Sequence, residues 1–93
     1  MAKVTKHGFA VGKNYFIRTV TNHFTGKLVA ISDQELVLVD AAWVADDGRF
    51  TQAIGKGELS EVEPYPDNQE VIVGRGSIVD ATLWNHPLPR TQK

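Results

Sequence analysis

Residues 26–40 are Gly-Lys-Leu-Val-Ala-Ile-Ser-Asp-Gln-Glu-Leu-Val-Leu-Val-Asp, and this stretch decides the fold class. It holds two runs of β-branched and aliphatic residues, 27–31 and 36–39, separated by four polar residues. Ser and Asp at such a position hydrogen-bond their own backbone and favour a turn. The pattern therefore predicts two antiparallel strands, the second continuing to residue 44 and apolar on both faces over its first part.

Further strands are predicted on both sides of this pair. Residues 15–21 are aromatic or β-branched except for one arginine, which is typical of a strand, and residues 22–26 form the predicted turn after it. Two strand-like runs, 70–73 and 77–84, flank Gly74-Arg75-Gly76, which we interpret as a tight turn with both glycines free to take positive φ. Five strands follow from the pattern.

The segment between the third and fourth strands, residues 45–69, is an acidic insertion. Its residues 49–54 have apolar side chains at the spacing of one helical turn, which Gly55 is expected to end. Residues 56–68 are polar and place Pro64 and Pro66 around Tyr65, so we expect a surface segment and no strand. The C-terminal segment, residues 85–93, contains two prolines and cannot continue a ladder.

The predicted fold is all-β: a small, strongly bent, five-stranded antiparallel barrel of the SH3-like kind, with a short helix in the insertion. Closing a short sheet on itself is the economical way to bury both faces of so few residues. Alternation along the strands predicts a core of apolar side chains, namely Phe16, Val20, Leu28, Ala30, Leu36, Leu38, Val71, Val73, Ile78 and Leu83.

Composition limits the function classes. The chain has 93 residues, no cysteine, 42% hydrophobic residues and a formal charge of −1, which indicates one globular domain over residues 1–93, with residues 1–13 as a flexible N-terminal segment. Thiol catalysis, disulfides and cysteine zinc sites are excluded. No apolar run approaches the roughly 20 residues that span a bilayer, and the start lacks the apolar stretch of a signal peptide, so we expect a cytoplasmic protein without membrane contact.

Charge is divided along the chain. Residues 1–31 contain five lysine or arginine side chains and no carboxylate, whereas residues 32–70 contain ten carboxylates against two cations. Such a division can steer a polyanion to one surface or match the basic surface of one subunit to the acidic surface of the next. Two solvated faces explain it equally well.

Residue types used in catalytic, nucleotide-binding and metal sites are present, but their spacing does not match the motifs of such sites. The three histidines are far apart in the sequence, and the short glycine motifs lack the further residues of nucleotide-binding loops. Ser77 is not in a nucleophile motif, and the adjacent carboxylates Asp46 and Asp47 are typical of a strand end before a helix. We therefore expect no enzyme, no cofactor and no metal site.

Two blocks of the sequence resemble the motifs of the Sm/LSm family. Residues 26–40 are similar to the first motif, in which a glycine bend leads into a strand, a polar turn and a third strand ending in Asp. Residues 71–79 are similar to the second, a strand, an Arg-Gly turn and an apolar strand. With the first strand, the resemblance covers residues 15–40 and 71–84. The long acidic insertion resembles elaborated Sm-like proteins of bacteria and their phages.

The resemblance implies a homo-oligomeric ring of about five to seven subunits, because cyclic closure pairs every strand edge. It also implies binding of single-stranded RNA, with Arg75 and Gly76 matching the family's second-motif pair. Lys27 and Lys13 are expected to assist, because the chain before Asp33 carries five cations and no carboxylate. Glu35 stands where the family commonly has an asparagine that contacts a base, and a carboxylate repels phosphate.

Two functions remain open at this point. One is a ring that binds single-stranded RNA, and the other is the same ring acting as a structural or protein-interaction module. For either ring we expect the subunit contact to join residues 38–44 to the strand after Arg75. The predicted interface residues are Leu38, Asp40, Trp43, Val79 and Trp84, with a tryptophan as the apolar anchor.

Overall fold

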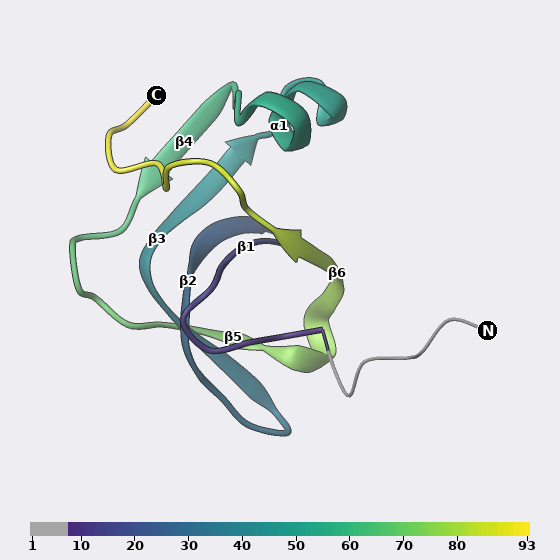
Figure 1. Cartoon of the computed structure of the whole chain (residues 1–93), viewed down its shortest axis with the longest axis vertical. Coiled ribbons are helices and arrows are strands. Elements are labelled where there is room, and N and C mark those ends of the chain that lie inside the picture. The colour runs from purple at the N-terminus through teal and green to yellow at the C-terminus, as the bar shows by residue number, and fades with distance from the viewer. Residues whose placement is uncertain (1–7) are drawn as a thin grey trace.

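The computed structural model describes residues 8–93 and consists mostly of antiparallel β-sheet with one short helix (Figure 1). The all-β prediction and the short helix in the insertion are thereby confirmed. The elements are β1 (Asn14–Thr19), β2 (His23–Ile31), β3 (Glu35–Asp46), α1 (Phe50–Lys56), β4 (Glu61–Pro64), β5 (Val71–Gly74), the 3-10 helix η1 (Arg75–Ser77) and β6 (Ile78–Leu83). No helix within the described range is both long and apolar enough to cross a bilayer.

Six strands form one sheet, in which β1, β2 and β3 make the predicted meander. Strand β6 pairs with β1, while β4 and β5 both pair with β3. Because β2 runs along one edge of β3, the two short strands share the other edge, β5 at residues 35–38 and β4 at residues 42–46. The prediction that residues 56–68 contain no strand is wrong, since β4 lies in that segment with Pro64 as its last residue.

Strand β3 changes direction between its two short partners. Asp40 has a φ of 50°, in the left-handed region that Asp tolerates better than most residues, and it lies between the part paired with β5 and the part paired with β4. The amide of Tyr65 donates to the carbonyl of Ala41 at 2.8 Å just beyond this point. The chain leaving β4 is thus tied to the bend in β3.

Strand β2 bends at Gly26. The ladder between β2 and β3 shifts register between Thr25 and Lys27, and a Cβ atom at Gly26 would lie 3.1 Å from the Cβ of Leu38. Glycine is needed here because β2 and β3 approach closely, as expected at a bulge. The predicted turn over residues 22–26 is wrong, because β2 already begins at His23.

The segment Gly74-Arg75-Gly76 does not form the predicted tight turn between paired strands. Gly74 has a φ of −68°, and neither it nor Gly76 has positive φ. Instead η1 turns a corner, so that β5 pairs with β3 and β6 pairs with β1. The strands pair in the order β5-β3-β2-β1-β6, and η1 links the two end strands, β5 and β6, along the chain. Within residues 8–93, however, no ladder of hydrogen bonds connects β5 to β6. The sheet is therefore open, and a closed five-stranded barrel is not shown.

Buried side chains form two clusters, one on each face of the sheet. The first contains Tyr15, Ile17, Phe24, Leu28, Leu36, Leu38, Ala41, Val71 and Val73, and the second contains Phe16, Ala42, Val44, Ala53, Leu59, Val62 and Trp84. Strand β1 contributes to both clusters, so three successive residues of it are buried.

Six of the ten predicted core residues are buried: Phe16, Leu28, Leu36, Leu38, Val71 and Val73. Ile78 is partly buried against the first cluster. Val20, Ala30 and Leu83 are exposed, and predicting them as core was wrong. Val20 lies in the turn after β1, and the register shift between Leu28 and Ala30 ends the simple alternation in β2.

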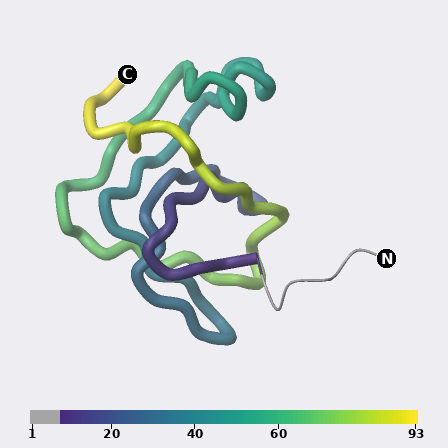
Figure 2. The backbone as a smooth tube through the Cα atoms, viewed as in Figure 1, coloured from purple at the N-terminus to yellow at the C-terminus, as the bar shows by residue number. Residues whose placement is uncertain are grey.

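The helix and the C-terminal segment cover the second cluster. Helix α1 continues through Gly55, against the prediction, and ends where Gly57 takes a φ of 72°. A Cβ atom on Gly57 would lie 2.7 Å from the ring of His86, so the C-terminal segment packs closely on the helix end. This segment then runs back beside β4 (Figure 2), where Val62 and Lys93 exchange two backbone hydrogen bonds of 2.9 Å.

Candidate functional site

Arg75, the predicted RNA contact, begins η1 and is engaged within the fold. Its Nη1 atom donates to the carbonyl of Ser32 at 2.6 Å, and its guanidinium carbon lies 6.0 Å from the centre of the Phe9 ring. Its amide also donates to the carbonyl of Gln34 at 2.8 Å, while Gly76 beside it is exposed. These contacts attach the corner at η1 to the turn between β2 and β3.

The two predicted lysines lie near each other, where β1 begins beside β2. Lys27 pairs with Asn14 across β1 and β2, and the carbonyl of Lys13 accepts a hydrogen bond from Leu28 at 2.9 Å. Both lysines are exposed. Arg75 instead bonds the turn after β2, at the carbonyls of Ser32 and Gln34. The structure therefore brings Lys13 and Lys27 together and leaves Arg75 at the end of β2.

The five predicted interface residues occupy different environments. Leu38 and Trp84 are 0% and 3% exposed, inside the two clusters of this same chain, and Asp40 lies at the bend of β3. Trp43 and Val79 are 39% and 65% exposed. Strand β3 itself has β2 on one edge and β4 and β5 on the other, so the predicted contact region does not present a free strand edge.

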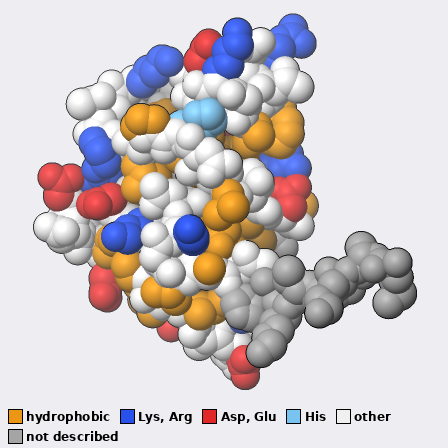
Figure 3. Space-filling model, viewed as in Figure 1, with side chains coloured by type: hydrophobic (Ala, Val, Ile, Leu, Met, Phe, Trp, Pro, Cys, Tyr) orange, Lys and Arg blue, Asp and Glu red, His pale blue; other side chains and the backbone are white. Residues whose placement is uncertain are grey.

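Free edges are found elsewhere in the sheet. The outer edge of β4 is covered by Lys93, whereas β5 pairs only with β3 and β6 only with β1 among the described residues. Exposed apolar side chains accompany these two strands, Ile72 on β5 and Val79 and Leu83 on β6. Figure 3 shows apolar side chains gathered over β6 and over the segment before β1. A strand edge with exposed apolar side chains beside it is a template for pairing with another strand.

The backbone of β6 is oriented for such pairing. The amide of Trp84 donates to the carbonyl of Asn14 at 2.9 Å. In the register of β6 on β1, Thr82 and Asp80 therefore also direct their backbone groups toward β1. In an antiparallel pair, every second residue of a strand bonds its partner strand, and the residues in between direct their N–H and C=O groups away from that partner. Ala81 and Leu83 therefore present unpaired donors and acceptors along the outer edge of β6.

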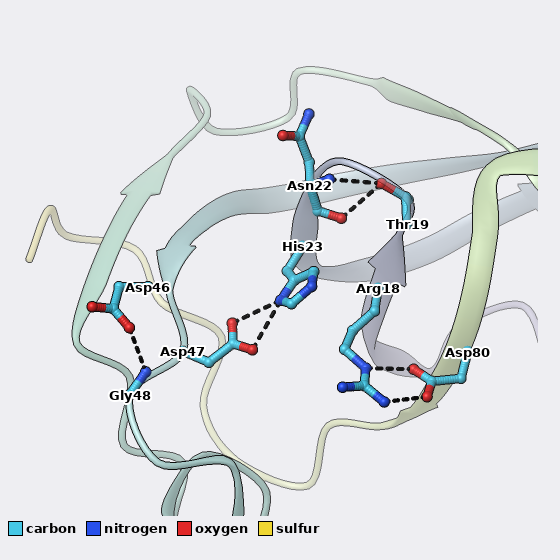
Figure 4. A network of polar contacts seen from close by, with 8 residues as sticks. All are labelled: Arg18, Thr19, Asn22, His23, Asp46, Asp47, Gly48 and Asp80. Carbon is cyan, nitrogen blue, oxygen red and sulfur yellow. Dashed lines mark hydrogen bonds and ion pairs between the residues drawn. The ribbon is translucent and has the colours of Figure 1, made fainter.

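A polar network lies where β1, β2 and β6 meet the loop before α1 (Figure 4). The Nδ1 atom of His23 is 2.9 Å from both carboxylate oxygens of Asp47, and Arg18 forms a two-pronged ion pair with Asp80. The hydrogen bond from Arg18 lowers the pKa of Asp80, and the same bond raises the pKa of Arg18. Arg18 also lies over the Phe50 ring, 4.9 Å from its centre.

This network joins several elements of the fold. The histidine–aspartate pair lies beside an ion pair that already uses the nearest arginine. No group of three or more potential metal ligands occurs among residues 8–93. The arrangement ties β6 to β1 and ties β2 to the start of the insertion.

Sequence reasoning missed the free edges because it paired β5 with β6 across a turn. Residues 71–73 are all apolar, so the sequence shows no signal of these edges; the burial of Val71 and Val73 and the exposure of Ile72 are seen only in the structure. No protein-family model, curated protein or solved structure matches this chain. Its function is therefore argued from its own geometry.

Proposed function

We propose that this protein assembles with copies of itself edge to edge, with β5 of one subunit pairing with β6 of the next. The observation that carries the proposal is the pair of edges on β5 and β6 that no strand of residues 8–93 covers, beside a β4 edge that Lys93 covers. An unpaired strand edge is a ready-made template for pairing with another strand. A second copy supplies the matching backbone groups.

Pairing of β5 with β6 uses both edges of every subunit. Each contact leaves one β5 edge and one β6 edge for further copies, so the interface is heterologous and closes into a ring when the rotation permits. The strands have four and six residues, and Ile72, Val79 and Leu83 add apolar surface beside them. We propose a closed homo-oligomer of about five to seven subunits, the size that the Sm-like resemblance implies.

The strand order supports an Sm-like barrel as the subunit. A three-strand meander with a glycine bend at Gly26 is followed by β5, η1 and β6, and the last strand returns to β1. The bend in β3 at Asp40 and the corner at η1 curve the two ends of the strand path toward each other. Strand β4 and α1 are then additions on one side of this barrel.

Single-stranded RNA is a second candidate, favoured by Lys13 and Lys27. Their exposed side chains form no ion pair in the described part of the chain. Replacing both with alanine is expected to weaken binding of oligo(U) and reduce its salt dependence, because fewer phosphates are then contacted. Arg75→Ala tests the contact that the resemblance implies. A ring that fails to bind oligo(U) at low salt is a structural or interaction module.

Sedimentation velocity of wild-type protein and charge variants tests the assembly. Val79→Lys places a charge on the β6 edge and is expected to give monomers of 10.3 kDa, because a buried lysine at a strand pair is costly. Val11→Lys is the matched control, since Val11 is similarly exposed and belongs to neither edge. Equal dissociation by both variants, or a monomeric wild type, would overturn the proposal.

A further inference from the structure

An aromatic groove opens where β2, β3 and β4 lie side by side. Phe24 of β2 is in register with Trp43 of β3, which is in register with Glu63 of β4, so the three side chains form one row across the sheet. The groove has a volume of about 390 Å³. Its lining is completed by Asn22, Pro64, Tyr65 and Pro66. The proposed assembly does not use this row, and neither predicted RNA lysine lines it.

One wall of the groove is fixed before any ligand binds. Tyr65 lies between two prolines, and its amide donates to the carbonyl of Ala41 at 2.8 Å. Arg90 donates to the carbonyl of Tyr65 at 2.9 Å and to the carboxylate of Asp67 at 2.5 Å. A rigid wall lowers the entropy cost of binding.

Several polar groups at the groove have no partner in residues 8–93. Neither the indole nitrogen of Trp43, the hydroxyl of Tyr65 nor the side-chain amide of Asn22 makes a hydrogen bond there, although other aromatic and polar side chains of the chain do. The carboxylate of Glu63 forms no ion pair within the same range. The groove thus combines aromatic surface, three donors and one unpaired negative charge.

These features match an extended peptide in the polyproline II conformation. Such a peptide has no internal hydrogen bonds, so its carbonyls accept from side-chain donors, and its proline rings pack on aromatic faces. The chain makes one such contact within itself, where the indole nitrogen of Trp84 donates to the carbonyl of Pro87 at 3.1 Å. Glu63 adds a preference for a cation, which the ring of Trp43 also attracts.

We propose that this groove binds a proline-rich extended segment of another protein that carries an arginine or lysine. The prolines lie against Trp43 and Tyr65, and the basic side chain meets Glu63. A nucleic acid is the less favoured occupant, because the carboxylates of Glu61 and Glu63 on β4 repel phosphate. The proposal does not depend on self-assembly, so it is tested on wild-type protein and on the Val79→Lys variant.

The probe is a fluorescein-labelled oligoproline peptide with one central arginine, followed by fluorescence anisotropy. Trp43→Ala is expected to weaken binding about thirtyfold, the loss typical of a central aromatic contact. Glu63→Gln is expected to weaken it about three- to fivefold, as for an exposed ion pair. Glu61→Gln is the matched control, because it removes the same charge from the same strand outside the groove, and it should leave binding unchanged.

Peptides with glutamate in place of arginine, and oligo(U), complete the design. Failure of the arginine peptide to bind at millimolar concentration would overturn the proposal, as would equal effects of Glu61→Gln and Glu63→Gln. Tighter binding of oligo(U) that depends on Trp43 would identify a nucleic-acid groove instead. A change in the number of subunits per assembly caused by Trp43→Ala would identify a second copy as the occupant. If Trp43→Ala does not fold, the comparison of peptide binding by Glu63→Gln and Glu61→Gln tests the proposal without it.

Discussion

The two sides of the sheet end differently. On the covered side, which consists of α1, β4 and residues 84–93, the chain supplies its own partners: Trp84 is 3% exposed and Lys93 pairs with the edge of β4. On the open side, which consists of the outer edges of β5 and β6, apolar side chains are exposed and the backbone groups have no partner in the part of the chain that the structure describes. We infer that apolar residues of the covered side stabilise the subunit and those of the open side associate subunits.

The largest stability effect is expected at Trp84. Trp84→Ala removes a ring that packs between Phe16 and His86 and leaves a cavity, so it should lower the free energy of unfolding by about 3–5 kcal/mol. Urea unfolding followed by circular dichroism measures it. Trp43→Ala is the control on an exposed tryptophan, and a loss as large as that of Trp84→Ala would break the comparison.

A smaller effect is expected where the C-terminal segment covers β4. Lys93→Pro removes the N–H that donates to Val62, and the loss of one such bond should cost about 1 kcal/mol. Lys93→Ala keeps the N–H and is the control in the same urea measurement. Equal stabilities of the two variants would mean that Lys93 does not close the β4 edge.

On the open side, Ile72→Lys should prevent the association of subunits while leaving the stability of each subunit nearly unchanged. Ile72 is 62% exposed, so in dilute protein its replacement is expected to change the free energy of unfolding by less than about 0.5 kcal/mol. The same variant should prevent assembly in size-exclusion chromatography, because it puts a charge beside the β5 edge. A strongly destabilised Ile72→Lys subunit would show that the open side also carries the fold.

The smallest effect concerns the ion pair that holds β6 to β1. Because Arg18 lowers the pKa of Asp80, the pair contributes stability above the unfolded pKa of about 4 and loses it as the pH falls through the lower folded pKa. Asp80→Asn should therefore flatten the fall in melting temperature below pH 4. Asp33→Asn, in the exposed turn before β3, is the control and should show the same fall in melting temperature with pH as the wild type. If the melting temperatures of all three proteins fall equally, the ion pair does not contribute this pH dependence.

Much of the fold could be predicted from local sequence pattern, and the errors of that prediction have physical causes. The meander and the helix are strongly patterned, so their strands and helical turn were predictable. Strand β4 was missed because only Val62 of its four residues is buried, and its final Pro64 is tolerated at an edge. The corner at η1 was predicted as a hairpin turn because a short glycine-rich segment fits either arrangement, and only the long-range pairing of β5 with β3 decides between them.

The candidate sites were less predictable because they depend on that long-range pairing. The open edges exist only because β5 and β6 pair with different strands. The aromatic groove needs Trp43 and Tyr65 to lie together, which follows from β4 pairing with β3. The burial of Trp84, whose indole nitrogen donates to the carbonyl of Pro87, has no local sequence signal either.

Native mass spectrometry of the full chain at micromolar concentration tests self-assembly most directly. The account predicts one dominant species at about five to seven times the 10.3 kDa subunit mass, and its loss in the Val79→Lys variant but not in Val11→Lys. A wild-type protein found only at 10.3 kDa would contradict the proposal that the edges of β5 and β6 join one subunit to the next.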